Sequence, residues 1–189
     1  MHSSYTSFIS MLTKVNLIAI DPGYREFGMA HFVGRQLTDF AVKSLRRPRR
    51  TNYAVLKDVM LRLLCEKKPD AIAIEINSPT GIAFGSPVMI VIRRILAMTS
   101  KCSVPVFGFA VNTVRKTVCG DGRASKRTIA KVVTAQFPEL RAYFNSDRRW
   151  RQRYYQNMFD AVAVGLTYLA MAKERKLFDY EVSQKQIDQ

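Results

Sequence analysis

The sequence predicts one α/β domain, spanning residues 15–177 of the 189. Short apolar, β-branched runs end abruptly at Pro, Gly or Asp, as buried strands do. They alternate with longer segments whose apolar residues recur at helical spacing. No internal repeat, linker or low-complexity block divides the chain. The expected order of elements is β-β-β-α-β-α-β-α-α, which is typical of the α/β class.

The first three expected strands form an antiparallel meander. Residues 15–20 (VNLIAI) are expected to be a buried strand that ends at Asp21-Pro22-Gly23, and residues 27–33 and 36–44 follow as two strands joined by a tight turn. The other expected elements are strands over residues 71–76 and 104–109 and helices over residues 52–66, 88–100, 125–136 and 158–176. Thr51 is the expected N-cap of the first helix. Tails over residues 1–14 and 178–189 are expected to be frayed.

Charge is the first clue to function. The chain carries 30 Lys and Arg against 15 Asp and Glu, a net charge of +15. This excess favours a polyanionic partner, nucleic acid before an anionic membrane surface, although a merely cationic enzyme would share it. Two basic segments, 46–50 (RRPRR) and 148–153 (RRWRQR), are expected to be loops. They contain the candidate phosphate contacts Arg46, Arg47, Arg49, Arg50, Arg148, Arg149, Arg151 and Arg153.

Cysteine and histidine offer little for catalysis. Cys65, Cys102 and Cys119 are widely spaced in apolar surroundings and are expected to be buried free thiols of a reducing compartment, the cytoplasm. No CxxC pair or Cys/His cluster indicates a zinc site. His31 lies in an alternating apolar segment, so we expect it to have a structural role.

Three acidic residues stand where apolar residues are expected. Asp21 ends one strand, Glu75 lies inside another, and Asp160 lies in the most apolar helix. Carboxylates are seldom fully buried without a partner. Each has an ordinary alternative: a turn residue for Asp21, and a nearby Lys or Arg partner for the other two. Together they predict one site where a divalent cation, Mg²⁺ or Mn²⁺, offsets the repulsion between carboxylates.

These residues resemble the motifs of the RuvC family of Holliday junction resolvases. Residues 18–23 (IAIDPG) and 27–30 (FGMA) are similar to the family's first strand, its D-P-G turn and the glycine of its second strand. Residues 73–75 (AIE) resemble the segment with its second acid, and residues 160–166 (DAVAVGL) its last motif. The ordered set spans roughly residues 17–172 and is far more specific than D-P-G alone.

A basic segment provides the most specific match. Residues 114–126 fit the family pattern V-K-x-T-V-x-G-x-G-x-A-x-K, with Arg115 in place of the first lysine and Lys126 at the second. Arg93 falls where the family has an arginine on the helix after the second acid. The resemblance implies that these three residues contact DNA, and that Lys126 meets the charge that develops at the scissile phosphate.

The resemblance implies an RNase H-like fold, a five-stranded mixed sheet of three antiparallel and then parallel strands, flanked by helices. It implies an endonuclease of DNA recombination and repair that resolves four-way junctions by paired symmetric nicks. Two Mg²⁺ or Mn²⁺ ions would be held by Asp21, Glu75, Asp160 and Asn157. Paired cutting implies a homodimer with residues 88–100 at its interface, and neither a membrane nor a small-molecule cofactor.

The chain departs from the family pattern at two places. Asn157 stands where the family has an acid or His, so either three carboxylates suffice or this is an engineered Asp→Asn change. An N-cap role is the other interpretation of Asn157. No aromatic residue closely follows Glu75, the nearest being Phe84, so contact at the junction centre is expected to differ. Such a divergent member would suit an organelle or a virus-infected host cell as well as the cytoplasm.

Two other functions stay open at this point. A nuclease of this kind could act on flaps, forks or structured RNA instead of four-way junctions. A domain with a native Asn157 could bind branched DNA without cutting it. An actin-like sugar kinase shares the opening strand and acid, but it requires a longer chain and glycine-rich phosphate loops, which this sequence lacks.

Overall fold

The computed structural model describes residues 15–47, 50–51, 53–76, 86–145 and 149–173, without the side chains of residues 46–51 and 149–153. Five strands form one mixed sheet in the order β3-β2-β1-β6-β7. The strands are β1 (Asn16–Asp21), β2 (Glu26–Val33), β3 (Gln36–Ser44), β6 (Ala71–Ile76) and β7 (Val106–Ala110). The first three are antiparallel and β1, β6 and β7 are parallel, which confirms the expected sheet.

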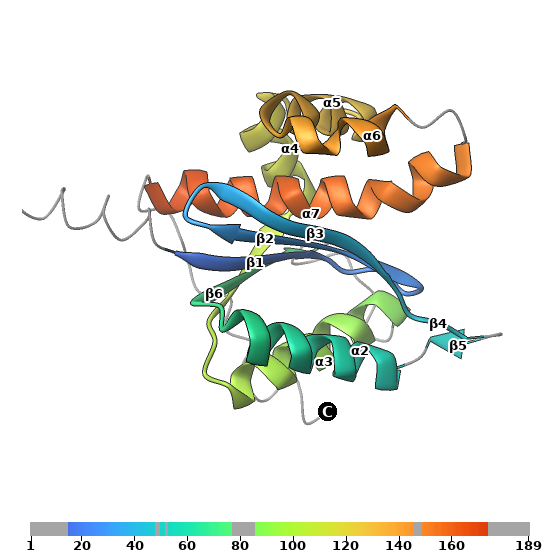
Figure 1. Ribbon diagram of the computed structural model, residues 1–189, viewed down its shortest axis with the longest axis vertical. Helices are drawn as coiled ribbons and strands as arrows, with labels where there is room; N and C mark the ends of the chain where they lie inside the picture. Colours follow the sequence, from blue (N-terminus) through green and yellow to red (C-terminus); the bar gives the residue numbers. More distant parts are fainter. Residues whose placement is uncertain (1–14, 48–49, 52, 77–85, 146–148, 174–189) are drawn as a thin grey trace, which may run out of the picture.

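Helices cover both faces of this sheet (Figure 1). They are α2 (Tyr53–Arg62), α3 (Pro87–Lys101), α4 (Val111–Cys119), α5 (Lys126–Gln136), α6 (Arg141–Phe144) and α7 (Arg149–Lys173), with a π-turn at Leu63–Lys67 and a 3₁₀ turn at Pro138–Leu140. The long α7 lies along one face, α4, α5 and α6 stack on its outer side, and α2 and α3 cover the opposite face. None of the helices in these described ranges is long and apolar enough to span a membrane.

Alternating side chains of β1 build the two halves of the core. Leu17 and Ala19 pack with residues of α7, whereas Ile18 and Ile20 pack with residues of α2 and α3. Successive side chains of a strand point to opposite faces, so a continuous apolar run such as that of β1 identifies a strand buried on both sides. The same alternation in β6 fixes the register of the two parallel strands.

A glycine lets α7 approach the sheet closely next to the first acid. Gly28 of β2 pairs with Asp21 of β1, and a Cβ at Gly28 would overlap the backbone carbonyl of Asn157 on α7. The family-like glycine of the second strand is therefore a packing requirement. It sets the height of α7 above the sheet where the candidate site lies.

Several expected element boundaries are wrong. The segment 46–50 is a two-stranded hairpin of β4 (Arg46–Arg47) and β5 (Arg50–Thr51), and not a plain loop. Thr51 lies in β5, so it is not the N-cap of α2, which begins at Tyr53. The basic segment 149–153 is also not a loop: it forms the first turns of α7, because Arg and Gln are good helix formers even without an apolar face.

The sequence gives no cap signal for one helix, α4. It follows β7 directly, and its N-cap residue, Ala110, makes no side-chain capping bond. By contrast, Ser125 caps α5 through its hydroxyl, which accepts from the amide of Thr128 at 3.1 Å. Helix α5 was predictable for this reason and α4 was not.

The cysteines are free, but the expectation that they are buried is wrong. Cys65 on the π-turn and Cys102 after α3 are exposed, and Cys119 at the end of α4 is half-buried. All three lie at or beyond helix ends, where apolar neighbours in the sequence do not enclose the side chain. His31 is structural as expected: it is 6% exposed, and its ring nitrogens lie 2.6 Å from Asn16 Oδ1 and 2.7 Å from Thr38 Oγ1.

Candidate active site

Two of the three acids come together because β1 and β6 are parallel neighbours. Ile20 pairs with Ile74, so Asp21 and Glu75, each the next residue along, stand side by side at the carboxyl end of the sheet. Helix α7 packs across β1 and β6 and contributes Asp160, whose side chain is 4% exposed. The topology therefore gathers three acids that lie far apart in the sequence.

The three carboxylates lie close enough together for their charges to raise the pKa values of Asp21 and Glu75. Burial, and then the charges of Glu75 and Asp160, raise the pKa of Asp21 well above its ordinary value, against a smaller lowering by Lys126. Burial and the charge of Asp160 raise the pKa of Glu75 to about 7, while Lys126 and Arg115 act in the opposite direction. These shifts have the cause expected of like charges that share a desolvated site.

Lys126, the first residue of α5, forms an ion pair with Asp160. Its Nζ donates to Asp160 Oδ2 at 2.9 Å. Burial alone would lower the pKa of Lys126, but the charge and hydrogen bond of Asp160, together with Asp21 and Glu75, raise it above its ordinary value. The lysine of the basic motif is thus placed at the carboxylates, as the resemblance implied.

Asn157 lies on α7 one turn before Asp160, and its N-cap interpretation is wrong. Helix α7 begins at Arg149, so Asn157 is an interior helical residue. Its Nδ2 donates to the carbonyl of Glu26 at the start of β2, at 3.3 Å. Because the amide nitrogen has this partner on β2, the amide oxygen is the atom that Asn157 can offer to a cation.

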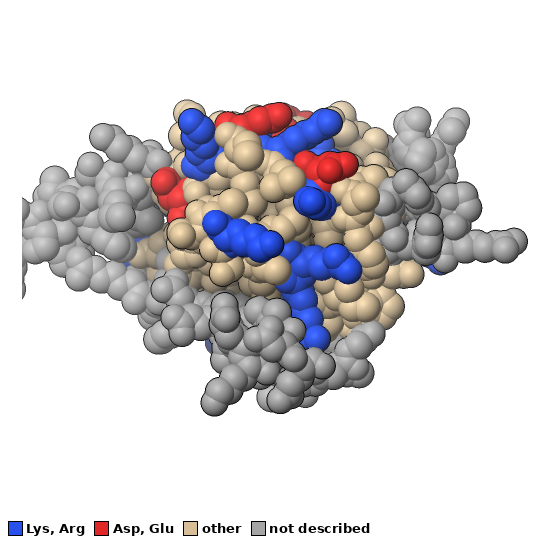
Figure 2. Space-filling view, turned by 90° about the horizontal axis from the view of Figure 1, so that it is seen from below, with Lys and Arg blue, Asp and Glu red and all other residues tan. Residues whose placement is uncertain are grey.

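Arg115 and Arg93 occupy different surroundings. Arg115 on α4 is close enough for its charge to lower the pKa of Glu75, and its buried Nε has no hydrogen-bond partner among the described residues. Arg93 lies half-buried on α3, on the opposite face of the sheet from α7. That face carries a band of Lys and Arg side chains (Figure 2). The exposed basic residues of α2 and α3 include Lys57, Arg62, Arg94 and Lys101.

The arginine-rich segments are only partly described. Arg46 and Arg47 lie in β4, Arg50 in β5, and Arg149, Arg151 and Arg153 in the first turns of α7. Arg49 and Arg148 lie outside the described residues, as do Phe84 and the tails. The assignment of these eight arginines to DNA stays a prediction.

Gln156 is a site residue that the sequence reasoning missed. Its Nε2 donates to Asp160 Oδ1 at 2.9 Å and lies 3.4 Å from the carbonyl oxygen of Lys126. The signal that could have revealed it is its spacing of four residues before Asp160, which puts both side chains on one helix face. Gln156 is uncharged and follows a run of basic residues, so nothing else in the sequence indicated that it belongs to the site.

The donor set suits a hard divalent cation. Three carboxylates and the Asn157 amide offer oxygen ligands, which Mg²⁺ and Mn²⁺ prefer, and the charges of Lys126 and Arg115 offset the repulsion between the acids only in part. Among the residues described, no group of three or more His, Cys, Asp or Glu side chains is already arranged to hold a metal ion. Asp160 instead has one oxygen bonded to Lys126 and the other to Gln156.

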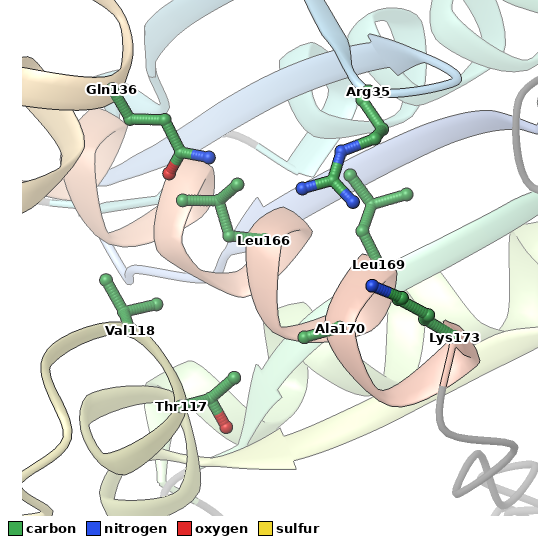
Figure 3. Close-up of a pocket in the computed structure, with 8 residues that line it drawn as sticks. All are labelled: Arg35, Thr117, Val118, Gln136, Leu166, Leu169, Ala170 and Lys173. Carbon is green, nitrogen blue, oxygen red and sulfur yellow. The ribbon is translucent and has the colours of Figure 1, made fainter.

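A separate cavity of about 340 Å³ lies toward the far end of α7 (Figure 3). The side chains of Arg35 and Lys173 line it on opposite sides of Leu169, and Gln136 reaches in from α5. None of the candidate site residues lines it. With Lys173 thirteen residues beyond Asp160, the end of this cavity is roughly 20 Å along the helix from the acids.

Stability of the metal-free protein should fall as pH rises. Glu75 binds its proton more tightly in the folded chain (pKa about 7) than at its ordinary pKa of 4.5. Protonation therefore stabilises the fold fully below the ordinary value, and this stabilisation is lost as pH rises through the folded one. We expect the melting temperature in EDTA to fall between pH 5 and 8, and Glu75→Gln to flatten that slope. A wild-type melting temperature that rises over this pH range would contradict the raised pKa of Glu75 in the folded chain.

Comparison with known proteins identifies relatives that match about two thirds of the chain. No family model matches the chain. The crossover junction endodeoxyribonuclease RuvC of Thermosipho melanesiensis is 30% identical over 135 residues, which cover 63% of this chain and 80% of that protein. The enzyme of the same name from Bartonella bacilliformis is 28% identical over 135 residues, covering 68% and 81%.

A solved structure shares the fold. Thermus thermophilus RuvC superposes with a TM-score of 0.66 at 19% identity, over 87% of this chain and 99% of that one. The same protein matches equally well in its complex with a Holliday junction substrate. The RNase H-like fold expected from the sequence is therefore confirmed.

Proposed function

Because this chain belongs to the RuvC family of crossover junction endodeoxyribonucleases, we propose that it is a structure-selective endonuclease that resolves four-way DNA junctions. The observation that carries the proposal is the meeting of Asp21, Glu75 and Asp160 beside Lys126 at one sheet edge. The Thermus relative bound to a Holliday junction substrate supports the choice of DNA. The net charge of +15 also suits a polyanionic substrate.

The four oxygen-bearing residues would hold Mg²⁺ or Mn²⁺, two ions in all. Asp21, Glu75 and Asp160 would supply the charged oxygen ligands, since their carboxylates act on one another, and the Asn157 amide oxygen would add a neutral ligand. Bound there, the metal supplies an activated water and a stabilised leaving oxygen for phosphodiester hydrolysis. The protein orients these donors through β1, β6 and α7, which are packed together.

Two cations of the chain would act on the phosphate itself. Lys126 reaches the site with its side chain 58% exposed, so its ammonium can meet charge that develops on a scissile phosphate. Arg115 brings a second positive charge close to Glu75, so its guanidinium would attract a phosphate group that binds there. Both residues belong to the basic motif that spans α4 and the start of α5.

DNA affinity should depend steeply on salt. The candidate contacts are Arg93, Arg115, Lys126 and the arginines of residues 46–50 and 148–153. Each phosphate that they neutralise releases counterions, so the log–log slope of affinity against salt is expected to be about −0.9 per contact. Fluorescence anisotropy of a labelled junction in EDTA measures this slope, and replacing Arg115 by Gln should reduce its magnitude by about 1. A nearly flat response would contradict a phosphate-based interface.

Paired cutting requires two active sites, so we expect a homodimer. Within residues 88–100, the expected interface segment, Ile92 and Ile95 are fully buried in the core and are not available to a partner. Ile90 on the same helix is 37% exposed and Val88 is half-buried. An interface through α3 would therefore use the turn around Val88 and Ile90, and Ile90→Glu should weaken dimerisation in sedimentation experiments without unfolding the chain.

Restoring an acid at Asn157 should have opposite effects on activity and on stability. Asn157→Asp adds a full negative charge for a hard cation, so Mg²⁺-dependent cleavage should rise by about tenfold or more. It also replaces the Nδ2 donor to the Glu26 carbonyl with an oxygen, so unfolding in EDTA should become easier by about 1–2 kcal/mol. Single-turnover cleavage and urea titration measure the two effects. A rise in cleavage below about threefold would remove Asn157 from the ligand set.

The proposed function is tested with labelled substrates of equal length. A four-way junction, a flap and an RNA duplex are incubated with the protein and Mg²⁺, and the nicks are mapped. Symmetrically paired nicks in the junction alone support resolution, whereas preference for the flap or RNA identifies a related nuclease with another substrate. Junction binding without any cleavage, by this chain and by its Asn157→Asp variant, would identify a binding module.

A further inference from the structure

Both oxygens of the Asp160 carboxylate are held by neighbouring side chains. Lys126 Nζ donates to Oδ2 at 2.9 Å and Gln156 Nε2 donates to Oδ1 at 2.9 Å. Gln156 Nε2 also lies 3.4 Å from the backbone carbonyl oxygen of Lys126. The three residues therefore form a closed hydrogen-bonded group, here named the Asp160 clamp, which ties α7 to the first residue of α5.

The two donors of the clamp differ in a way that matters for function. Gln156 is neutral and lies on the same helix as Asp160, one turn earlier, so its position relative to the carboxylate is fixed by the helix. Lys126 is a cation at the end of a long side chain that is 58% exposed, so it can leave the carboxylate without disturbing the core. Asp160 itself is 4% exposed and cannot follow it into solvent.

We propose that Gln156 is a positioning residue that holds Asp160 Oδ1, while Lys126 occupies Oδ2 until a divalent cation displaces its ammonium. The inference rests on the proposed function, because it concerns how the carboxylates receive their metal. The Lys126 ammonium thus has two positions. It is bonded to Asp160 before a cation binds, and it is released to contact a DNA phosphate once the cation neutralises the acids. The glutamine keeps the carboxylate in place throughout the exchange.

This arrangement makes Lys126 and the metal competitors for the same oxygen. A positive charge within contact distance of a carboxylate opposes a second cation at that carboxylate, and the opposition is strong where water is excluded. Removal of the ammonium should therefore strengthen metal binding, whereas removal of Gln156 should weaken it, since Asp160 loses the donor that fixes one oxygen. If the two residues had only a structural role, their removal would not change metal affinity in opposite directions.

The experiment is a Mn²⁺ titration followed by electron paramagnetic resonance, without DNA. We expect Lys126→Met to bind Mn²⁺ about tenfold more tightly than wild type and Lys126→Arg to stay within about threefold of it. Gln156→Leu should bind about fivefold more weakly. Lys131→Met, which removes an exposed charge from α5, is the matched control and should leave the affinity unchanged.

A stability measurement covers variants that fold poorly. Gln156→Glu sets a carboxylate against Asp160, so its melting temperature should fall in EDTA and recover with Mn²⁺ by more than the wild type gains. If Lys126→Met binds Mn²⁺ no better than wild type, or if Gln156→Leu matches wild type, the clamp is wrong while the metal site stands. If wild type and Lys126→Met both fail to bind Mn²⁺, or if Asp21→Asn does not alter binding, the metal site of the proposed function fails too.

Discussion

Replacing Asp21 by Asn abolishes junction cleavage, with an expected loss of at least about a thousandfold in single-turnover rate. Asp21 ends β1 next to Glu75 of β6, and the charges of both Glu75 and Asp160 act on it. The three carboxylates therefore act on one another, and Lys126 offsets only part of their charge. Loss of the Asp21 charge removes one of the three charged oxygen ligands that the cations would need.

Junction binding should survive the same substitution, because the candidate phosphate contacts are arginines and lysines elsewhere. Fewer negative charges at the sheet edge should even strengthen binding in EDTA slightly. Asp58→Asn, which alters an exposed acid on α2, is the matched control and should cleave like wild type. Cleavage by Asp21→Asn within a few-fold of wild type would show that the reaction takes place at another site.

Replacing Gly28 by Ala should destabilise the fold by at least about 3 kcal/mol, because the added Cβ meets backbone and not a flexible side chain. It would overlap the carbonyl group of Asn157, and its next neighbour is the amide nitrogen of Met158. Relief requires α7 to move away from β2, which carries Asp160 away from Asp21. Urea unfolding in EDTA measures the loss of stability, and cleavage at low temperature measures the accompanying loss of activity.

Gly122→Ala is the comparison for this change. A Cβ on Gly122 would lie 3.3 Å from the carbonyl oxygen of Asn112 on α4. Because Gly122 itself lies in the loop between α4 and α5, which can shift slightly, the expected loss of stability is below about 1 kcal/mol. If Gly28→Ala lowers the free energy of unfolding by no more than Gly122→Ala does, the close contact between β2 and α7 does not set the distance of α7 from the sheet.

The sheet and the three acids were predictable because each leaves a local signal. Strands β1 and β6 are uninterrupted apolar runs, and a carboxylate within or at the end of such a run is conspicuous. Once β1 and β6 are paired as parallel neighbours, this pairing alone predicts that Asp21 and Glu75 lie side by side. Lys126 became a candidate only through the resemblance to a family, because a lysine at a helix start is otherwise unremarkable.

The parts that were not predictable depend on tertiary contacts. Gln156 becomes a site residue only because α5 begins against α7 at Lys126. The amide of Asn157 is fixed by Glu26, 131 residues away in the chain, and only the true start of α7 excludes its capping role. Cys65 and Cys102 were expected inside because their sequence neighbours are apolar, yet both lie at turns on the surface.

The proposed function requires this chain to cut a four-way junction at two symmetric positions, with metal held by Asp21, Glu75 and Asp160. A supercoiled plasmid with an inverted repeat that extrudes a cruciform tests it most directly. With Mg²⁺, the wild-type protein should convert this plasmid to linear DNA, because both strands are nicked during a single binding event. The Asp21→Asn variant should leave the plasmid supercoiled. Nicked circles without linear product, or equal cutting of a plasmid that lacks the inverted repeat, would contradict the account.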